Sequence, residues 1–159
     1  MDINKLMNAL DNDANELIMN LTTTKITEMN VNILKELHLS NEITANYLKK
    51  LKGYRYVDEI NELKQGLFIR WIPIINPEYL PLHNCAMICE IKITDDGMLI
   101  TCKNFMHRYY TFKIEECLIF QKLTNQELVI IAALDHLEKE KNNNLDNTYS
   151  DSNNSEDDN

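Results

Sequence analysis

Hydrophobic residues at the start of the chain recur at alternating steps of four and three positions, which is the spacing of a helical heptad. The residues that follow this spacing are Ile3, Met7, Leu10, Ala14, Leu17 and Leu21. An isolated helix of this length is marginally stable in water, so its apolar stripe must pack against another surface. The pattern predicts a helix that packs on its own domain. The alternative is a coiled-coil seam with a partner helix or a second copy, with these candidate residues: Ile3, Met7, Leu10, Leu17 and Leu21.

Helical periodicity continues in two further segments after three threonines. The apolar positions of the first segment are Ile26, Met29, Ile33, Leu34 and Leu37, and those of the second are Ile43, Tyr47, Leu48 and Leu51. Ser40 stands where a side chain caps the start of the second segment, and Gly53 stands where a glycine ends it. We therefore predict a helical region over residues 1–52.

From Gly66 onward the period of the pattern changes to two, which is typical of strands. The predicted strands cover residues 67–75, 85–94, 98–103, 108–113 and 117–122, and Asp95-Asp96-Gly97 forms a hairpin turn between two of them. One apolar face of the second strand is predicted to carry Cys85, Met87, Cys89, Ile91 and Ile93. Five short strands with tight turns favour a small antiparallel SH3-like or Tudor-like β-barrel, or a curled sheet.

A capping box begins the last predicted helix, because the Thr124 hydroxyl and the Glu127 carboxylate can satisfy each other's free amides. The side chains expected to face the body of the protein are Leu128, Ile131, Leu134 and Leu137. After Lys141 the sequence consists mostly of Asn, Asp and Ser, which bury too little apolar surface to offset their ordering entropy. The prediction is an α+β protein: a helical region (1–52), a small β-barrel with a C-terminal helix (53–141) and a disordered acidic tail (142–159).

Charge is unevenly distributed in this acidic chain of 159 residues, whose formal net charge is −9. Residues 49–122 carry 11 basic and 9 acidic side chains, whereas both flanking segments are acidic. No stretch approaches the roughly 18 apolar residues of a membrane helix, and the first residues do not resemble a signal peptide. We therefore expect an intracellular protein that does not bind membranes.

The cysteines Cys85, Cys89, Cys102 and Cys117 all lie in the central block. On one strand face the first two would be about 13 Å apart, too far to share a zinc ion. We therefore expect buried free thiols in a reducing compartment, and no metal and no cofactor. The sequence has no phosphate-binding glycine loop and no HExxH or GxSxG motif, so we expect no catalytic residues and no enzyme activity.

Aromatic residues alternate with basic ones in the central block, a pattern that serves either to fill a core or to stack on bases and pair with phosphates. The candidate binding residues are Tyr54, Arg55, Tyr56, Arg70, Lys103, Phe105, His107, Arg108 and Tyr109. The first hypothesis is a non-enzymatic interaction module that binds a protein partner or self-associates. The alternative is a nucleic-acid-binding accessory protein with an autoinhibitory acidic tail. In that tail, Thr148 and Ser155 each precede an acid by three positions and are candidate phosphorylation sites.

The segment from Leu51 to Ile72 resembles uncharacterised proteins of nucleocytoplasmic large DNA viruses. The resemblance extends through Asp96-Gly97 and Thr101-Cys102-Lys103 to Phe120-Gln121-Lys122, and it covers only the central block. It implies a viral protein made in the host cytoplasm and either packaged in the virion or active in genome replication or assembly. It brings no site residues with it.

Overall fold

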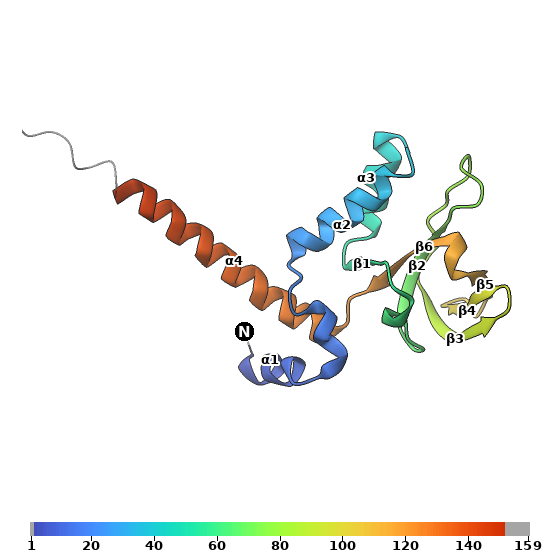
Figure 1. The fold of residues 1–159 in the computed structure, drawn as a ribbon, viewed down its shortest axis with the longest axis horizontal. Helices are drawn as coiled ribbons and strands as arrows, with labels where there is room; N and C mark the ends of the chain where they lie inside the picture. Colours follow the sequence, from blue (N-terminus) through green and yellow to red (C-terminus); the bar gives the residue numbers. More distant parts are fainter. Residues whose placement is uncertain (1, 152–159) are drawn as a thin grey trace, which may run out of the picture. The chain divides into compact units, whose positions relative to one another are not determined.

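The computed structural model describes the backbone of residues 2–151 and the side chains of residues 2–148 (Figure 1). It confirms an α+β protein with N-terminal helices, an antiparallel sheet and a C-terminal helix. The chain forms two compact units. The first combines the residues up to Lys25 with those from Thr124 onward, and the second is Ile26–Leu123. These limits differ from the predicted boundaries after residues 52 and 141.

The first unit contains α1 (Ile3–Leu10), the short 3-10 helix η1 (Asp13–Ile18) and α4 (Asn125–Asp151). The prediction of one continuous helix through Leu21 is wrong, because α1 ends before Asn12. The Asn12 side chain accepts a hydrogen bond from the Ala14 amide and so starts a new turn. Asparagine side chains compete with the helical backbone in this way, and this interrupts the heptad.

The capping box of α4 is confirmed: the Thr124 amide donates to Glu127 Oε1 at 3.0 Å, and the Glu127 amide donates to Thr124 Oγ1 at 3.2 Å. The predicted packing face needs correction. Ile130 and Ile131 are buried, whereas two of the predicted residues, Leu128 and Leu137, are 46% and 56% exposed.

The predicted disordered tail is not confirmed, because residues 142–151 continue α4 as a helix and residues 152–159 lie outside the described residues. Extending an existing helix needs no new nucleation, so even a polar segment can follow it.

In the second unit, α2 (Thr23–Lys35, beginning in the first unit) and α3 (Asn41–Lys50) confirm the two predicted helices. Ser40 Oγ accepts from the Ile43 amide at 3.3 Å, as expected of an N-cap. Gly53 follows α3 with a φ of +84°, the left-handed conformation that ends helices.

Six antiparallel strands form one sheet in the order β1-β6-β2-β3-β4-β5. The strands are β1 (Tyr54–Val57), β2 (Phe68–Pro73), β3 (Ala86–Thr94), β4 (Gly97–Asn104), β5 (Tyr109–Lys113) and β6 (Cys117–Lys122), with short 3-10 helices η2 (Ile60–Glu62) and η3 (Ile114–Glu116). The five predicted strands and the turn before Gly97 are present, and β1 is a sixth strand that was not predicted. The sheet is not closed into a barrel, because β1 and β5 remain at its two edges.

Each face of the sheet has its own core. One face, here called the core face, carries Ile69, Trp71, Ile88, Ile100 and Ile119. The opposite face, here called the helix face, packs Ile72, Leu118 and Phe120 against residues of α2 and α3 that include Leu34 and Leu48.

The predicted apolar face of the β3 strand is wrong, because the pairing with β4 shifts between Ile88 and Glu90. This irregularity makes Cys89 an extra residue, so the alternation of faces reverses there. As a result, Ala86 and Ile88, which precede the extra residue, and Ile91, which follows it, all pack in the same core.

Candidate functional site

The helix face is covered over only part of its width. The helices pack on β1, β6 and β2, while the helix-face residues of β3, β4 and β5 are all partly or fully exposed. One row of side chains crosses this open part, because strand register places them opposite one another: Lys122, Phe68, Met87, Lys103 and Tyr109. We call this row and its neighbours on β3–β5 the open face.

Two pairs of a lysine and an aromatic ring lie along the row, one on each side of Met87. The Lys122 Nζ lies 6.0 Å from the centroid of the Phe68 ring, and the Lys103 Nζ lies 5.4 Å from that of Tyr109. Tyr109 is 64% exposed, so much of its ring is available to a ligand. The arrangement presents flat aromatic surface beside positive charge, which is the chemistry of a cation–π pair that a third flat group can join.

The β4–β5 hairpin tip extends the open face. Asn104 Oδ1 accepts hydrogen bonds from the amides of Met106 and Arg108, both at 2.9 Å, and His107 adopts a left-handed φ of +61°. These bonds fix the tip while leaving Phe105 and Met106 each 74% exposed. The Phe105 ring stacks on Phe68 with centroids 6.0 Å apart, which joins the tip to the row.

The charge of the open face is positive although the chain is acidic. Register places Lys92, Lys103 and Lys113 on the open face, and Lys122 lies at its border. Among the described residues that β3, β4 and β5 contribute to this face, Glu90 is the one acidic side chain. The Thr101 and Thr111 hydroxyls lie 3.1 Å apart at its centre and add hydrogen-bonding groups.

The predicted binding residues divide into two groups. Five of them lie on the β4–β5 hairpin: Lys103, Phe105, His107, Arg108 and Tyr109. Lys103, Phe105 and Tyr109 come together at the open face, whereas His107 and Arg108 are exposed at the hairpin tip. Tyr54 and Arg55 are buried in β1 at 8% and 4% exposure, so neither reaches a ligand at the surface. Burial raises the pKa of the Tyr54 hydroxyl, and a hydrogen bond with Cys85 is the next cause of this shift.

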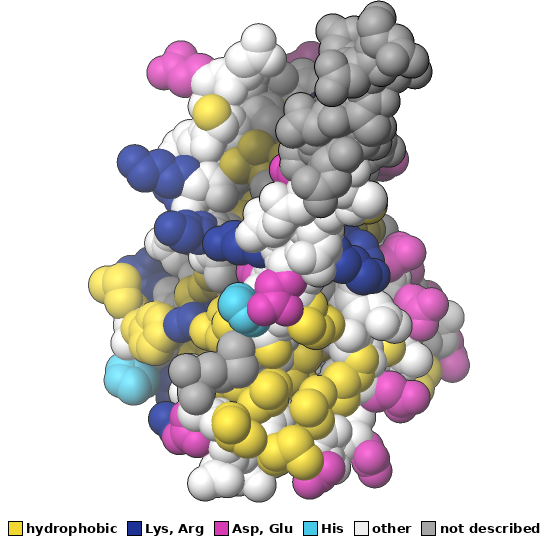
Figure 2. Space-filling model, turned by 90° about the vertical axis from the view of Figure 1, so that its left-hand side faces the viewer, with side chains coloured by type: hydrophobic (Ala, Val, Ile, Leu, Met, Phe, Trp, Pro, Cys, Tyr) yellow, Lys and Arg dark blue, Asp and Glu magenta, His cyan; other side chains and the backbone are white. Residues whose placement is uncertain are grey.

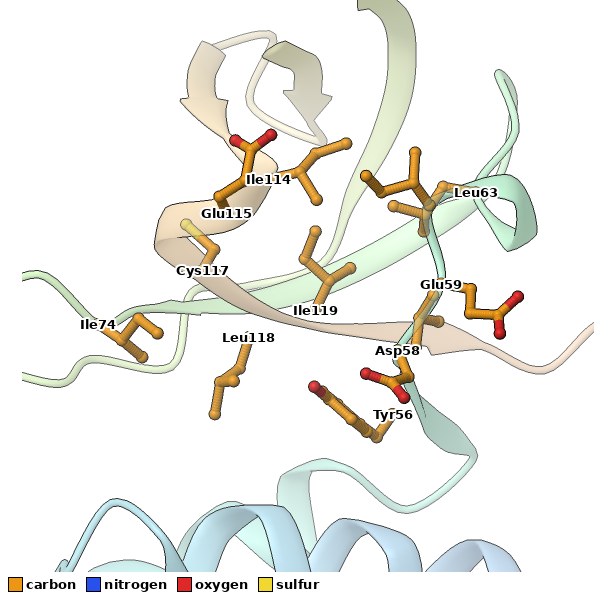
Figure 3. A pocket seen from close by; sticks show the side chains of 12 residues that line it. Tyr56, Asp58, Glu59, Leu63, Ile74, Ile114, Glu115, Cys117, Leu118 and Ile119 are labelled. Atoms are coloured by element: carbon orange, nitrogen blue, oxygen red, sulfur yellow. The ribbon is translucent and has the colours of Figure 1, made fainter. Parts of the chain in front are cut away.

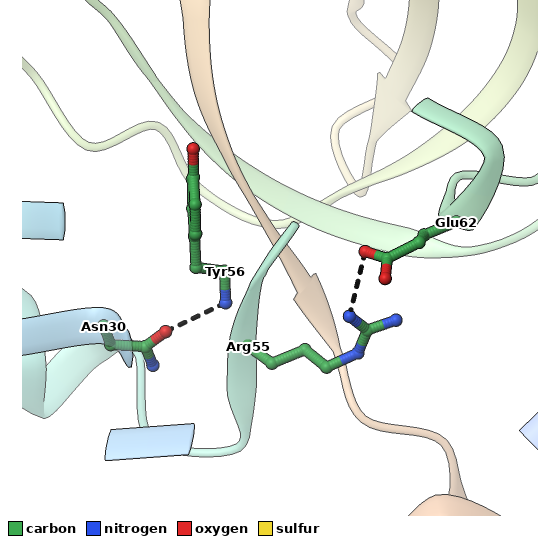
Figure 4. A network of polar contacts seen from close by, with 4 residues as sticks. All are labelled: Asn30, Arg55, Tyr56 and Glu62. Atoms are coloured by element: carbon green, nitrogen blue, oxygen red, sulfur yellow. Dashed lines mark hydrogen bonds and ion pairs between the residues drawn. The ribbon is translucent and has the colours of Figure 1, made fainter. Parts of the chain in front are cut away.

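The remaining two predicted residues, Tyr56 and Arg70, are half-buried and, like Arg55, make structural contacts. The Arg55 Nη1 is 3.2 Å from Glu62 Oε2, and the Tyr56 amide donates to Asn30 Oδ1 at 2.9 Å (Figure 4). The Arg70 side chain donates to the carbonyl oxygens of His83 and Lys50. These contacts hold β1 and the segments around β2 together.

The predicted oligomer seam lies in the first unit and is largely uncovered. Ile3, Met7, Leu10 and Leu17 are 71%, 51%, 40% and 52% exposed, while Ala9 is buried and Leu21 is half-buried. Figure 2 shows hydrophobic side chains gathered on the lower part of the face it presents. The stripe of α1 is therefore available for a further contact.

Other predicted features are located as follows. Cys85 belongs to the helix-face core and Cys102 to the core face, and within the described residues no three His, Cys, Asp or Glu side chains cluster as metal ligands would. Thr148 is exposed on α4 and donates to the Asn144 carbonyl at 2.6 Å, whereas Ser155 lies outside the described residues. Among residues 2–151, no helix is long and apolar enough to cross a membrane.

Phe68, Met87 and Lys122 belong to the open face but were not predicted. They come from three separate strands, so only the strand order and register bring them together. Comparisons with protein-family models, with curated proteins and with solved structures find no match to this chain, and the resemblance to viral proteins stays a prediction from the sequence.

Proposed function

We propose that the second unit is a non-enzymatic binding module that holds single-stranded nucleic acid on its open face. The observation that carries this proposal is the row from Lys122 to Tyr109, which holds two pairs of a lysine and an aromatic ring. Unpaired bases stack on exposed aromatic rings, and lysines beside the rings neutralise the phosphates that link the bases. A fully paired duplex presents no base faces for this contact.

The size of the open face also supports this ligand. The row crosses five strands, so it extends over four inter-strand spacings of about 4.8 Å, or about 19 Å. That length accommodates several bases of an extended strand, with the fixed hairpin tip at one end. Because Asn104 already holds the tip in shape, little ordering entropy is lost when a ligand binds.

The test is fluorescence anisotropy of labelled oligo-dT and oligo-U with the full chain at about 50 and 200 mM salt. We expect salt-dependent binding to both, with a log-affinity slope that becomes shallower by about 1.4 in the double variant Lys103→Gln/Lys122→Gln, since each lost phosphate contact removes about 0.7. The matched control is Lys5→Gln/Lys139→Gln, which removes the same charge at exposed positions of the first unit. Equal slopes in the two double variants, or no binding by the wild type, would refute the proposal.

The predicted inhibitory role of the acidic tail has its own test. A chain ending at Asp151 keeps the whole of α4 and loses three acidic residues and no basic ones. We propose that this truncation tightens oligonucleotide binding at low salt. Unchanged affinity would remove the tail from the proposal and leave the open face untouched.

Self-association through α1 is a second candidate function. It is supported by the exposure of Ile3 and Met7, which are on the same stripe of a helix whose other side packs in the first unit. Sedimentation velocity on the wild type and on Ile3→Ser/Met7→Ser tests it. A dimer lost in the variant supports the seam, and a wild-type monomer at about 100 μM refutes it.

A further inference from the structure

A second site lies on the second unit, where the strand ends of β1 and β6 meet η2 and η3 (Figure 3). The sheet does not close, so the core remains open there to a cavity of about 330 Å³. Its apolar lining includes Val57, Ile60, Leu63, Ile114 and Ile119. A cavity of this size admits a single long side chain and not a large cofactor.

The polar side chains around this pocket include three carboxylates: Asp58, Glu59 and Glu115. No lysine or arginine is among its lining residues. Asp58 and Glu59 are exposed and lie at the rim of the pocket, where their charges contribute to a negative potential. Glu115 is oriented by the Met98 amide, which donates to its Oε1 at 3.2 Å. Hydrogen bonds from its own amide and from that of Met98 lower the pKa of Glu115 and keep it charged.

Two neutral groups in the lining, Tyr56 and Cys117, have raised pKa values, with burial as the largest cause in both. Burial raises the pKa of Tyr56, and the charges of Asp58 and Glu36 raise it further. Burial raises the pKa of the Cys117 thiol to about 12, with the Glu116 charge as the next cause. The pocket therefore combines an apolar floor, formed by its valine, leucine and isoleucine side chains, with a negative potential from the three carboxylates.

We propose that this pocket binds a lysine or arginine side chain from an extended, basic and aliphatic segment of a partner protein. The alkyl stem of such a side chain packs on the isoleucine floor while its charged end reaches the carboxylates at the mouth. An uncharged aliphatic side chain would gain nothing from the carboxylates, and a nucleic acid would be repelled by them. The proposal uses none of the residues of the open face and does not depend on it.

The test is a titration of the full chain, labelled at isoleucine, leucine and valine methyl groups, followed by NMR. The probe is a capped hexapeptide that alternates valine with arginine, and its control alternates valine with glutamine. We expect the arginine peptide to shift the methyl signals of Ile60, Ile114 and Ile119 and to leave Leu99, on the open face, unchanged. Equal shifts by the glutamine peptide, or no shift at the pocket, would overturn the proposal.

Charge variants separate this site from general attraction to an acidic protein. The variant Asp58→Asn/Glu59→Gln should raise the dissociation constant of the arginine peptide by about fivefold, equivalent to about 1 kcal/mol. The control Asp11→Asn/Glu16→Gln makes the same charge change at exposed positions of the first unit and should leave the affinity unchanged. If both pairs weaken binding equally, the pocket is not the site. Oligonucleotide binding by Asp58→Asn/Glu59→Gln should equal that of the wild type, so the two proposals can fail separately.

Discussion

Asn30 of α2 completes the exposed backbone edge of β1, and its loss should destabilise the second unit. The residue is 4% exposed. Its Nδ2 donates to the Tyr54 carbonyl at 3.0 Å, and its Oδ1 accepts from the Tyr56 amide at 2.9 Å (Figure 4). Since β1 pairs only with β6, this one amide side chain makes the two bonds that a neighbouring strand would make.

The variant Asn30→Ala removes both bonds and leaves a buried donor and a buried acceptor without them. Each unsatisfied buried group costs about 1–3 kcal/mol, so the two together cost about 2–6 kcal/mol. Alanine also forms helix better than asparagine, which returns about 0.7 kcal/mol. Asn32→Ala measures that gain alone, because Asn32 is exposed on the same helix.

The assay is equilibrium unfolding in urea, with the free energy of unfolding compared at a shared m-value. Native-state hydrogen exchange supplies a second readout, since the Tyr56 amide should exchange faster in Asn30→Ala than in Asn32→Ala. If the two variants have the same free energy of unfolding, the bridge from Asn30 to β1 does not stabilise the protein and the reasoning is refuted.

Three further predictions follow from single side chains. His83 stacks on Trp71, and burial lowers its pKa below the usual 6.5. Its contribution to the free energy of unfolding should therefore be complete above pH 6.5 and lost as the pH falls. His83→Phe should flatten the pH dependence of urea unfolding, and an unchanged profile would contradict this. Thr124→Ala should lower the free energy of unfolding by about 1 kcal/mol through loss of the capping box, and a wild-type urea midpoint would argue against it. Burial raises the pKa values of Cys102 and Cys117 to about 12, so iodoacetamide at pH 8 should label both thiols only after unfolding, as read by mass spectrometry; labelling of either in the native protein would contradict the prediction.

Local signals in the sequence predicted the elements whose determinants are close together along the chain. Ser40 and Thr124 each bond to an amide three residues ahead, so the cap and its partner can be seen in one short segment. The hairpin turn before Gly97 is equally local, because its two central residues join strands that follow each other directly. Such features depend on backbone chemistry more than on tertiary packing.

Features that depend on distant partners were missed or assigned wrongly. The strand Tyr54–Val57 is short, and it is stabilised by β6, which lies far along the chain. The reversal of faces in β3 results from one extra residue, Cys89, relative to β4. A period-2 pattern cannot contain that information, because a bulge is defined by two strands together.

Asparagine illustrates the same limit. The abundance of asparagine in this sequence carries no positional signal, yet individual asparagines make specific bonds. Asn30 bridges to β1, Asn104 holds the hairpin tip, and the buried Asn15 donates to the Ala9 carbonyl at 2.9 Å. Which asparagines matter depends on which backbone groups lack a partner in the folded chain.

The second unit carries equal numbers of basic and acidic side chains, but the two kinds gather at different places on it. Residues 26–123 carry twelve basic and twelve acidic side chains, so their net charge predicts no preference for any ligand. Register nevertheless gathers lysines on the open face, whereas the gap between η2 and η3 gathers carboxylates around an apolar floor. This separation of charge would direct a polyanion and a basic peptide to different places on the second unit. We expect the oligonucleotide and the arginine peptide to bind together without competition, and mutual displacement would mean that they share a site.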